Sequence, residues 1–214
     1  MSFNLCALYG DRGVIAGDRM LSWEDGSCVV GDSGKIFELS DGLVVGYAGN
    51  ELVSQMMMSC FAGIIGDEEK KSLELFERKI KDFKKRFDPI YRIIPKEWLN
   101  MCRGSGHLMG VGVFENELKA FSVNYVPVYE DYSVDVLKKP GVIASNADGN
   151  ERLQKFFPTA LKWILSLGPA FSDEGIVLLF KKIFGSIAKY DETVSPCGDL
   201  MILRRDGTSK KLTF

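Results

Sequence analysis

The chain has 214 residues, of which 46% are hydrophobic and 26% are charged, and its formal net charge at pH 7 is −2. This length and composition are typical of one globular domain with a sizeable core, so a single domain is expected over residues 1–214. The nearly balanced charge predicts no general affinity for nucleic acid or for anionic membranes, and no run of about 18 apolar residues exists that could form a transmembrane helix. The first residues also lack the basic and apolar segments of a signal peptide.

Five cysteines are scattered along the chain, and no two of them form a C-x-x-C pair. An odd number without paired spacing is typical of reduced thiols and not of a disulfide framework or a zinc site, so a cytoplasmic location is expected. Cys6 lies within an apolar segment, which favours a buried core thiol over a nucleophile. The five are Cys6, Cys28, Cys60, Cys102 and Cys197.

The first fifty residues contain two pairs of short apolar segments joined by turn residues. Residues 3–9 and 14–19 flank a polar turn with two glycines, and residues 35–39 and 43–48 flank a Ser-Asp-Gly turn. Each pair predicts a β-hairpin. Between the hairpins, a loop is predicted around one short strand at residues 27–30.

Helices are predicted to follow the second hairpin. Asn50 is a suitable N-cap for a helix that ends at Gly66, in which apolar residues recur every three or four positions. A second helix is predicted over residues 67–88, with Pro89 marking its end. One face of this helix is apolar and the other is basic. We interpret the basic face as solvated, with nucleic-acid binding as the weaker alternative, because the net charge of the chain is −2.

The second half of the chain returns to strands and then alternates strands with helices. Predicted strands cover residues 108–114, 118–124, 126–136, 142–146, 199–203 and the last residues to Phe214. Predicted helices cover residues 150–167, with an interruption at Pro158, and residues 172–189. Because strands and helices segregate, we expect an α+β fold, a four-layer αββα sandwich in which two antiparallel sheets lie between helical layers.

Three glycine-containing motifs stand in and around the two predicted hairpins. They are GVIAGD at residues 13–18, GKIF at residues 34–37 and GYAG at residues 46–49. In this order they resemble the proteasome-type N-terminal-nucleophile hydrolases, the family of the proteasome β-subunits and the bacterial peptidase of the HslV kind. In that family the nucleophile is the first residue of the mature chain, and the same offset before Asp18 leads here to Ser2. The family usually has threonine there, and Lys35 lies one residue later than the family's lysine.

The resemblance implies an active site built on Ser2, Asp18, Lys35 and Gly49. A hydroxyl is a weak nucleophile unless a base accepts its proton, and a free α-amine, with a pKa of about 8, can be that base on the same residue. A nearby Lys35 would lower the pKa of the amine, Asp18 would hold Lys35, and the Gly49 N–H would face the developing oxyanion. The mechanism requires removal of Met1, because otherwise the amine of Ser2 lies within a peptide bond.

The same resemblance implies further site residues. Ser145 matches a serine that lies beside the family's nucleophile. Ser195 matches a second one, although Glu192 stands three residues before it where the family has aspartate. The pocket for the substrate side chain that precedes the scissile bond would be lined by Leu21, Ser33 and Tyr47, with Glu51 and Gln55 at its edge.

The resemblance also implies hydrolysis of peptides or unfolded proteins, self-association into rings, and an unfolding AAA+ ATPase as partner for folded substrates. No metal or organic cofactor is expected. Two alternatives stay open: an inactive proteasome-like subunit with a structural role, and an amidohydrolase of the same superfamily that acts on a small amide. A Ser-His-Asp site is not favoured, because the only histidine, His107, lies where a loop is expected to enter a strand.

Overall fold

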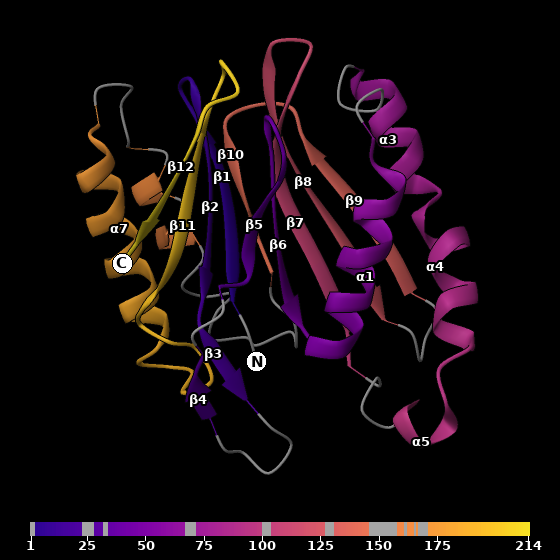
Figure 1. Ribbon diagram of the computed structural model, residues 1–214. Coiled ribbons are helices and arrows are strands. Elements are labelled where there is room, and N and C mark those ends of the chain that lie inside the picture. Colours follow the sequence, from indigo (N-terminus) through magenta and orange to yellow (C-terminus); the bar gives the residue numbers. More distant parts are fainter. Residues whose placement is uncertain are drawn as a thin grey trace.

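The computed structural model contains two five-stranded antiparallel sheets that pack face to face, with helices on both outer faces (Figure 1). The α+β four-layer sandwich expected from the sequence is confirmed. The described residues are 3–22, 28–31, 34–66, 72–99, 104–126, 131–145, 158–160, 162–164, 166 and 171–214. Within these ranges, no helix is both long and apolar enough to cross a membrane.

The first sheet has the strand order β10-β1-β2-β11-β12. β1 and β2 pair from Asn4↔Gly17 to Tyr9↔Arg12, which confirms the first predicted hairpin. β11 pairs with the whole of β2, so the C-terminal strands lie beside the N-terminal ones. The strands are β1 (Asn4–Tyr9), β2 (Arg12–Asp18), β10 (Gly141–Ala144), β11 (Gly198–Arg204) and β12 (Ser209–Thr213).

The second sheet has the order β5-β6-β7-β8-β9, so each strand pairs with the next one along the chain. The turn between β7 and β8 consists of Glu115 and Asn116, whose φ angles of 53° and 63° suit a type I′ hairpin. The strands are β5 (Ile36–Ser40), β6 (Leu43–Gly49), β7 (Gly106–Phe114), β8 (Glu117–Val126) and β9 (Asp131–Leu137). A separate ribbon pairs β3 (Met20–Ser22) with β4 (Cys28–Val30).

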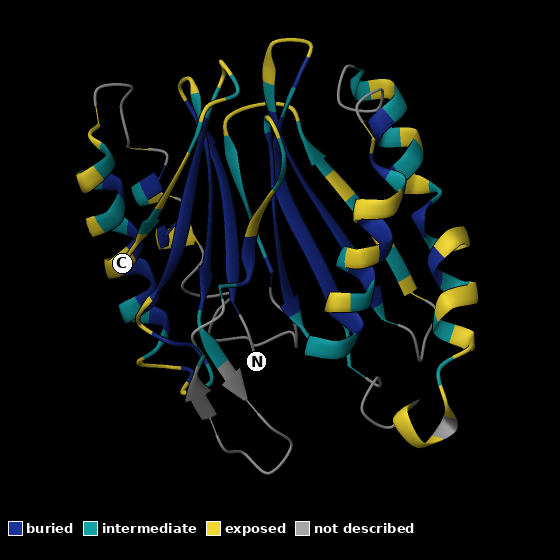
Figure 2. Cartoon of the chain, in the orientation of Figure 1, coloured by how far each residue is buried: buried dark blue, intermediate teal, exposed yellow. Residues whose placement is uncertain are grey.

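Hydrophobic clusters join the layers, and Figure 2 shows the buried strands at the centre of the molecule. Cys6 is fully buried between the two sheets, and burial raises the pKa of its thiol, which confirms the expected core thiol. On the outer face of the first sheet, Phe180 and Phe184 of α7 (Asp173–Ile187) fill a second cluster. On the outer face of the second sheet, phenylalanines from three helices and two strands fill the third: Phe61, Phe76, Phe83, Phe87, Phe114 and Phe121.

The helices that supply this third cluster are α1 (Glu51–Ile64), α3 (Leu73–Lys81) and α4 (Phe83–Arg92), and the short α5 (Lys96–Leu99) follows them. Asn50 caps α1 as predicted, because its side chain accepts a hydrogen bond from the Val53 N–H (3.1 Å). Ser172 caps α7 in the same way, through the Gly175 N–H (3.1 Å). Most of the helix predicted over residues 150–167 lies outside the described residues, although residues 158–160 and 162–164 are helical.

The prediction of a single helix over residues 67–88 is wrong. The chain forms two helices that meet at Asp82, and α4 continues through Pro89 to Arg92. Tertiary packing overrides the local preference against helix before proline, because Phe87 packs on the Tyr125 ring and the Tyr125 hydroxyl donates to Asp88 (2.7 Å).

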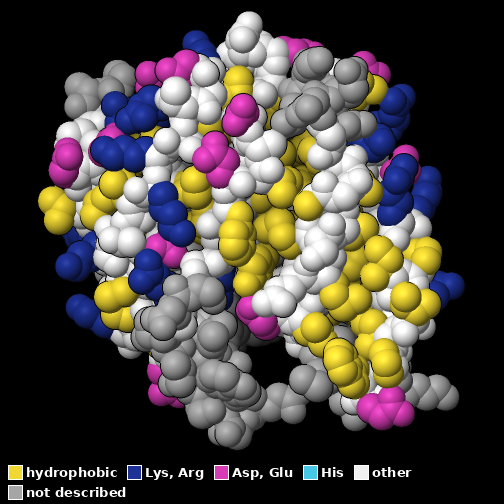
Figure 3. Space-filling model, in the orientation of Figure 1, with side chains coloured by type: hydrophobic (Ala, Val, Ile, Leu, Met, Phe, Trp, Pro, Cys, Tyr) yellow, Lys and Arg dark blue, Asp and Glu magenta, His cyan; other side chains and the backbone are white. Residues whose placement is uncertain are grey.

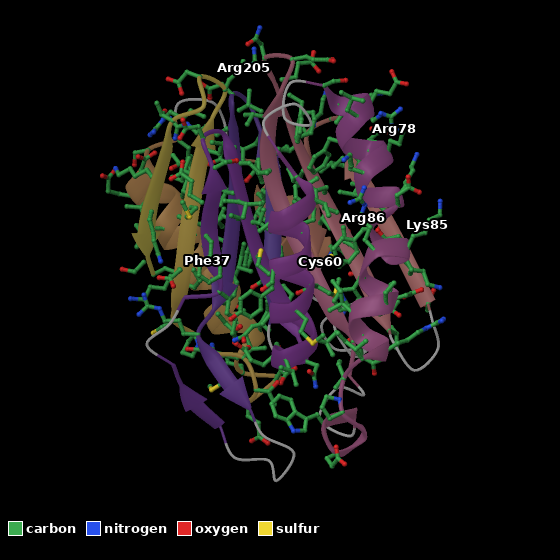
Figure 4. All side chains as sticks on the ribbon, turned by 45° about the vertical axis from the view of Figure 1, so that its right-hand side comes forward. Phe37, Cys60, Arg78, Lys85, Arg86 and Arg205 are labelled. Atoms are coloured by element: carbon green, nitrogen blue, oxygen red, sulfur yellow. The ribbon has the colours of Figure 1, made fainter. Side chains whose placement is uncertain are left out.

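The six residues predicted to form the basic face lie exposed or half-buried on α3 and α4. They are Arg78, Lys79, Lys81, Lys84, Lys85 and Arg86. Figure 4 shows Arg78 and Lys85 projecting away from the sheet, and the Lys85 side chain is 81% exposed while it pairs with Asp82 (2.7 Å). These positions agree with a solvated face.

Asp173, in the first turn of α7, ties this helix to the first sheet through three basic residues. Its carboxylate lies 3.2 Å from Arg12, 3.1 Å from Arg204 and 2.9 Å from Lys210. The hydrogen bond from Lys210, with the other two charges, lowers the pKa of the Asp173 carboxyl. The stability gained is therefore present above the unfolded-state pKa of about 4 and is lost as the pH falls through the lower folded-state value.

We expect Asp173→Asn to lower the free energy of unfolding by about 1 kcal/mol at neutral pH, because such pairs are partly screened by solvent. At a pH below the folded-state pKa of Asp173 the difference from the unsubstituted chain should nearly vanish. Urea unfolding at both pH values measures it, and an equal loss at both would contradict an ionic origin.

Candidate active site

A buried ion pair lies where β2 ends and β5 begins. Asp18 is 0% exposed and Lys35 is 2% exposed. Lys35 Nζ lies 3.5 Å from Asp18 Oδ1 and donates to the Met20 carbonyl oxygen at 2.5 Å. Burial raises the pKa of the Asp18 carboxyl, whereas the Lys35 charge and three backbone N–H donors act in the opposite direction. Two side chains that the sequence assigns to one site are thus in contact.

Backbone N–H groups from distant parts of the chain converge on the Asp18 carboxylate. Phe3 donates to Oδ1 (3.1 Å), and Met20 and Ser195 donate to Oδ2 (3.3 and 3.2 Å). The Phe3 contact matters most, because Phe3 directly follows Ser2, the residue that the sequence indicates as nucleophile. Asp18 therefore holds the backbone next to that position.

Ser145 and Asn4 anchor the start of β1. The Ser145 hydroxyl oxygen accepts from the Asn4 N–H (2.9 Å), and the Ser145 N–H donates to the Asn4 carbonyl (2.9 Å). The Asn4 side-chain amide donates to the Tyr47 carbonyl (2.7 Å), and the Tyr47 N–H donates to the Lys35 carbonyl (3.1 Å). These bonds gather three predicted site residues around the first residue of β1. A contact of the Ser145 hydroxyl with the amine of Ser2 stays a prediction.

Gly49 ends β6 in a backbone conformation that favours glycine, with φ +93°. A Cβ atom at this position would lie 2.2 Å from the Ser105 carbonyl oxygen, so there is no room for a side chain. The same carbonyl accepts a hydrogen bond from the Asn50 N–H (2.7 Å). The peptide after Gly49 is thus held firmly between β6 and α1.

An aromatic and acidic surface adjoins Gly49, and Figure 3 shows hydrophobic side chains gathered where β5 and β6 meet α1. The Tyr47 hydroxyl and the Gln55 side-chain amide both donate to Glu51 Oε1 (2.8 and 2.7 Å). Phe37, labelled in Figure 4, is 43% exposed. Its ring stacks on that of Tyr47, with ring centroids 6.0 Å apart. Burial and the hydrogen bond to Glu51 raise the pKa of Tyr47 to about 12, so its hydroxyl stays protonated and donates.

The other predicted positions are placed as follows. Ser2 and Ser33 lie outside the described residues, and Leu21 lies in β3 without a described side chain. Glu192 is exposed on the turn before β11, whereas its neighbour Asp191 is buried and accepts hydrogen bonds within that turn. The carboxylate that this turn buries is therefore that of Asp191 and not that of Glu192.

Two buried polar residues near the site were not predicted from the sequence, Asn4 and Asp199. Asp199 is 1% exposed and binds Arg19 through both carboxylate oxygens (2.5 and 3.3 Å). A Cβ atom on Gly34 would lie 2.2 Å from Asp199 Oδ2, so this carboxylate lies against the backbone just before Lys35. The available signal was a polar residue at the start of an otherwise apolar strand, which both Asn4 and Asp199 provide.

Solved structures share this architecture. The eukaryotic HslV from Trypanosoma brucei aligns with a TM-score of 0.64 and 16% identity, over 94% of this chain and 99% of that one. The chain has the fold of the HslV-like N-terminal-nucleophile hydrolases. A Gly-1 mutant of Anbu from Hyphomicrobium sp. strain MC1 aligns with a TM-score of 0.64 and 11% identity, over 100% of this chain and 87% of that one. No family model and no curated protein matches the sequence, so the HslV-like likeness is one of fold.

Gly49→Ala is expected to lower the free energy of unfolding of this HslV-like domain by about 2–4 kcal/mol, because the new Cβ would overlap the Ser105 carbonyl and force a positive φ on alanine. As a matched control, Gly185→Ala in α7 meets nothing within 4 Å. That variant should gain up to about 1 kcal/mol from the better helix propensity of alanine. Chemical unfolding of both measures the difference, and similar effects would contradict a close approach at Gly49.

Proposed function

We propose that the chain is a peptidase whose nucleophile is the hydroxyl of Ser2, at the mature N-terminus that removal of Met1 leaves. The observation that supports this most is the Asp18–Lys35 pair, which is buried against the backbone of Phe3, one residue after Ser2. Burying two charges costs several kcal/mol per ion, so a pair at this position in an HslV-like fold suits catalysis better than stability.

The α-amine of Ser2 is the general base in this proposal. It accepts the hydroxyl proton, through a water molecule, while the Ser2 oxygen attacks the carbonyl carbon of the scissile amide. The tetrahedral intermediate collapses to an ester on Ser2, and the proton passes to the leaving amine. A water molecule then hydrolyses the ester and restores the hydroxyl.

Lys35 and Gly49 supply the electrostatic part of the mechanism. The positive charge of Lys35 favours the unprotonated amine, and Asp18 keeps Lys35 in place. The Gly49 N–H meets the negative charge on the carbonyl oxygen in the transition state. Donors of this kind contribute about 2.7–4 kcal/mol each.

We also propose a preference for a basic side chain before the scissile bond. In this proposal Tyr47, Glu51 and Gln55 contribute to the pocket for that side chain, together with Leu21 and Ser33, as the family resemblance assigns them. The Glu51 carboxylate attracts a cation, and the exposed Phe37 ring, stacked on Tyr47, offers an aromatic face to the same group. Peptides or unfolded proteins are the substrates in this proposal. Self-association into rings would restrict access to them, and an AAA+ ATPase would supply them from folded proteins.

The nucleophile is tested by intact-mass spectrometry of the purified chain before and after treatment with a peptide epoxyketone. We expect a mass that lacks Met1 and a single adduct that maps to Ser2, because only a free N-terminal residue combines the hydroxyl with its base. The Ser2→Ala variant should form no adduct. A chain that keeps Met1 and forms no adduct would overturn the proposal and favour the inactive structural subunit.

The pocket is tested with Glu51→Gln. We expect kcat/KM for peptides with lysine or arginine before the scissile bond to fall roughly five- to tenfold, which corresponds to about 1 kcal/mol for one partly exposed charge pair. Values for peptides with leucine there should change little.

Glu115→Gln is the matched control, because Glu115 follows the far end of β7, about 30 Å along the strand from Gly106. It should leave both substrate classes unchanged. An equal loss for basic and neutral peptides in Glu51→Gln would contradict the proposed preference.

A further inference from the structure

The only histidine of the chain lies directly behind Gly49. His107 is in β7, is 7% exposed, and pairs in register with Ala48 of β6 and Asn124 of β8. Its Nδ1 lies 2.5 Å from Asn124 Oδ1, and its Nε2 lies 2.9 Å from the Ser105 hydroxyl oxygen. Both ring nitrogens are therefore hydrogen-bonded inside the sandwich.

Two contacts connect the His107 ring with Gly49. A Cβ atom on Gly49 would lie 3.0 Å from His107 Cδ2, so the edge of the ring lies against the glycine. Ser105 makes the second connection, because its hydroxyl contacts the ring and its carbonyl accepts the Asn50 N–H (2.7 Å). The residue that holds the peptide between Gly49 and Asn50 is thus bonded to the imidazole.

The protonation state of His107 determines the direction of these bonds. The Asn124 side-chain nitrogen reaches the Ser133 hydroxyl (3.2 Å), which leaves the Asn124 oxygen facing the His107 Nδ1–H. In the neutral ring Nε2 is then an acceptor, and the Ser105 hydroxyl donates a hydrogen bond to it. Once the ring is protonated, Nε2 becomes a donor, and the Ser105 hydroxyl must turn its proton elsewhere. Histidine is the side chain that makes this change between about pH 5 and 8.

Other ionisable groups lie on the elements packed around β7. Glu51 is in the first turn of α1, and Asp131 and Asp135 flank Ser133 on the same face of β9. The Asp18–Lys35 pair is buried at the end of β2, and Cys6 of β1 is kept neutral by burial. The ring itself is hydrogen-bonded to two uncharged side chains, those of Asn124 and Ser105.

We propose that His107 is a positioning residue for Gly49. The protonation state of its imidazole sets the hydrogen bond to the Ser105 hydroxyl and, through Ser105 and the ring edge that lies against Gly49, the orientation of the backbone that carries the Gly49 N–H. The neutral ring gives the arrangement described above, and protonation turns the N–H away from the oxyanion. The consequence for catalysis rests on the proposed function, whereas the coupling between His107 and Gly49 does not.

The coupling is tested by NMR on the full chain, where a single histidine removes any need to assign the imidazole signal. Ala-Gly occurs only at residues 16–17, 48–49 and 62–63, so ¹³C-alanine with ¹⁵N-glycine labelling isolates the Gly49 amide among three signals. We expect the Gly49 amide shift to follow pH with the midpoint of the imidazole titration. His107→Gln should abolish this dependence.

Ser105→Ala separates a relay through the hydroxyl from a mere effect of charge. It removes the hydroxyl and keeps the carbonyl that binds the Asn50 N–H. The imidazole should still titrate in this variant, while the Gly49 amide loses most of its response. A Gly49 amide that ignores the imidazole titration in the unsubstituted chain, or that responds fully in Ser105→Ala, would overturn the proposal.

The catalytic consequence is read from the pH dependence of the rate of epoxyketone adduct formation at Ser2. In the unsubstituted chain, the rate should fall by an extra factor of roughly 10 or more as the imidazole is protonated, less than the 10²–10³-fold loss for removal of a whole donor. His107→Gln should lack this step. If the rate of adduct formation had the same pH profile in both chains, the proposal for His107 would be overturned, while the assignment of Ser2 as nucleophile would stand. Absence of any adduct, with the Gly49 amide still coupled to the imidazole, would instead reject the peptidase function alone.

Discussion

The buried ion pair of Asp18 and Lys35 requires hydrogen-bond partners from the structure around it. The attraction between two buried charges offsets their desolvation only when further hydrogen bonds satisfy both groups. Here Asp18 accepts three backbone N–H groups, and Lys35 donates to the Met20 carbonyl. These partners come from the residue before β1, the first residue of β3 and the turn before β11, so the pair is complete only when both ends of the chain have folded together.

The layer between the two sheets changes from apolar to polar along its strands. In its middle, Cys6 of β1 and Met109 of β7 fill the space, and the residues two positions before them on the same faces are Asn4 and His107. Side chains alternate across a strand with a period of two, so these polar groups enter the same layer. Asn4 Oδ1 is buried without a hydrogen-bond partner among the described residues, next to the segment that contains Ser2. The layer between the sheets is therefore polar at the end that contains the candidate site, whereas its apolar centre stabilises the fold.

The candidate site draws its rigidity from strand pairing. β1 is paired on both edges, with β10 and with β2, so the backbone leading to Ser2 is fixed in position. Gly49 lies on the opposite sheet, and its peptide is fixed by Ser105 at the end of a neighbouring strand. The proposed nucleophile and the proposed oxyanion donor are thus held by different sheets, and the packing of the two sheets sets the distance between them.

The sequence by itself determined the elements whose signals are local. Alternating apolar segments with glycine turns predicted the hairpins, Asn50 and Ser172 predicted two helix starts, and the family resemblance of the glycine motifs grouped Asp18 with Lys35. Local signals failed where packing decided: Pro89 did not end a helix, because contacts of Phe87 and Asp88 with Tyr125 hold α4 together. Only the tertiary structure revealed that Asp199 pairs with Arg19, that Asp191 and not Glu192 is buried, and that His107 lies against Gly49. These facts depend on strands far apart in the chain coming side by side, and the free energy of that pairing comes from the whole sandwich and not from any local segment.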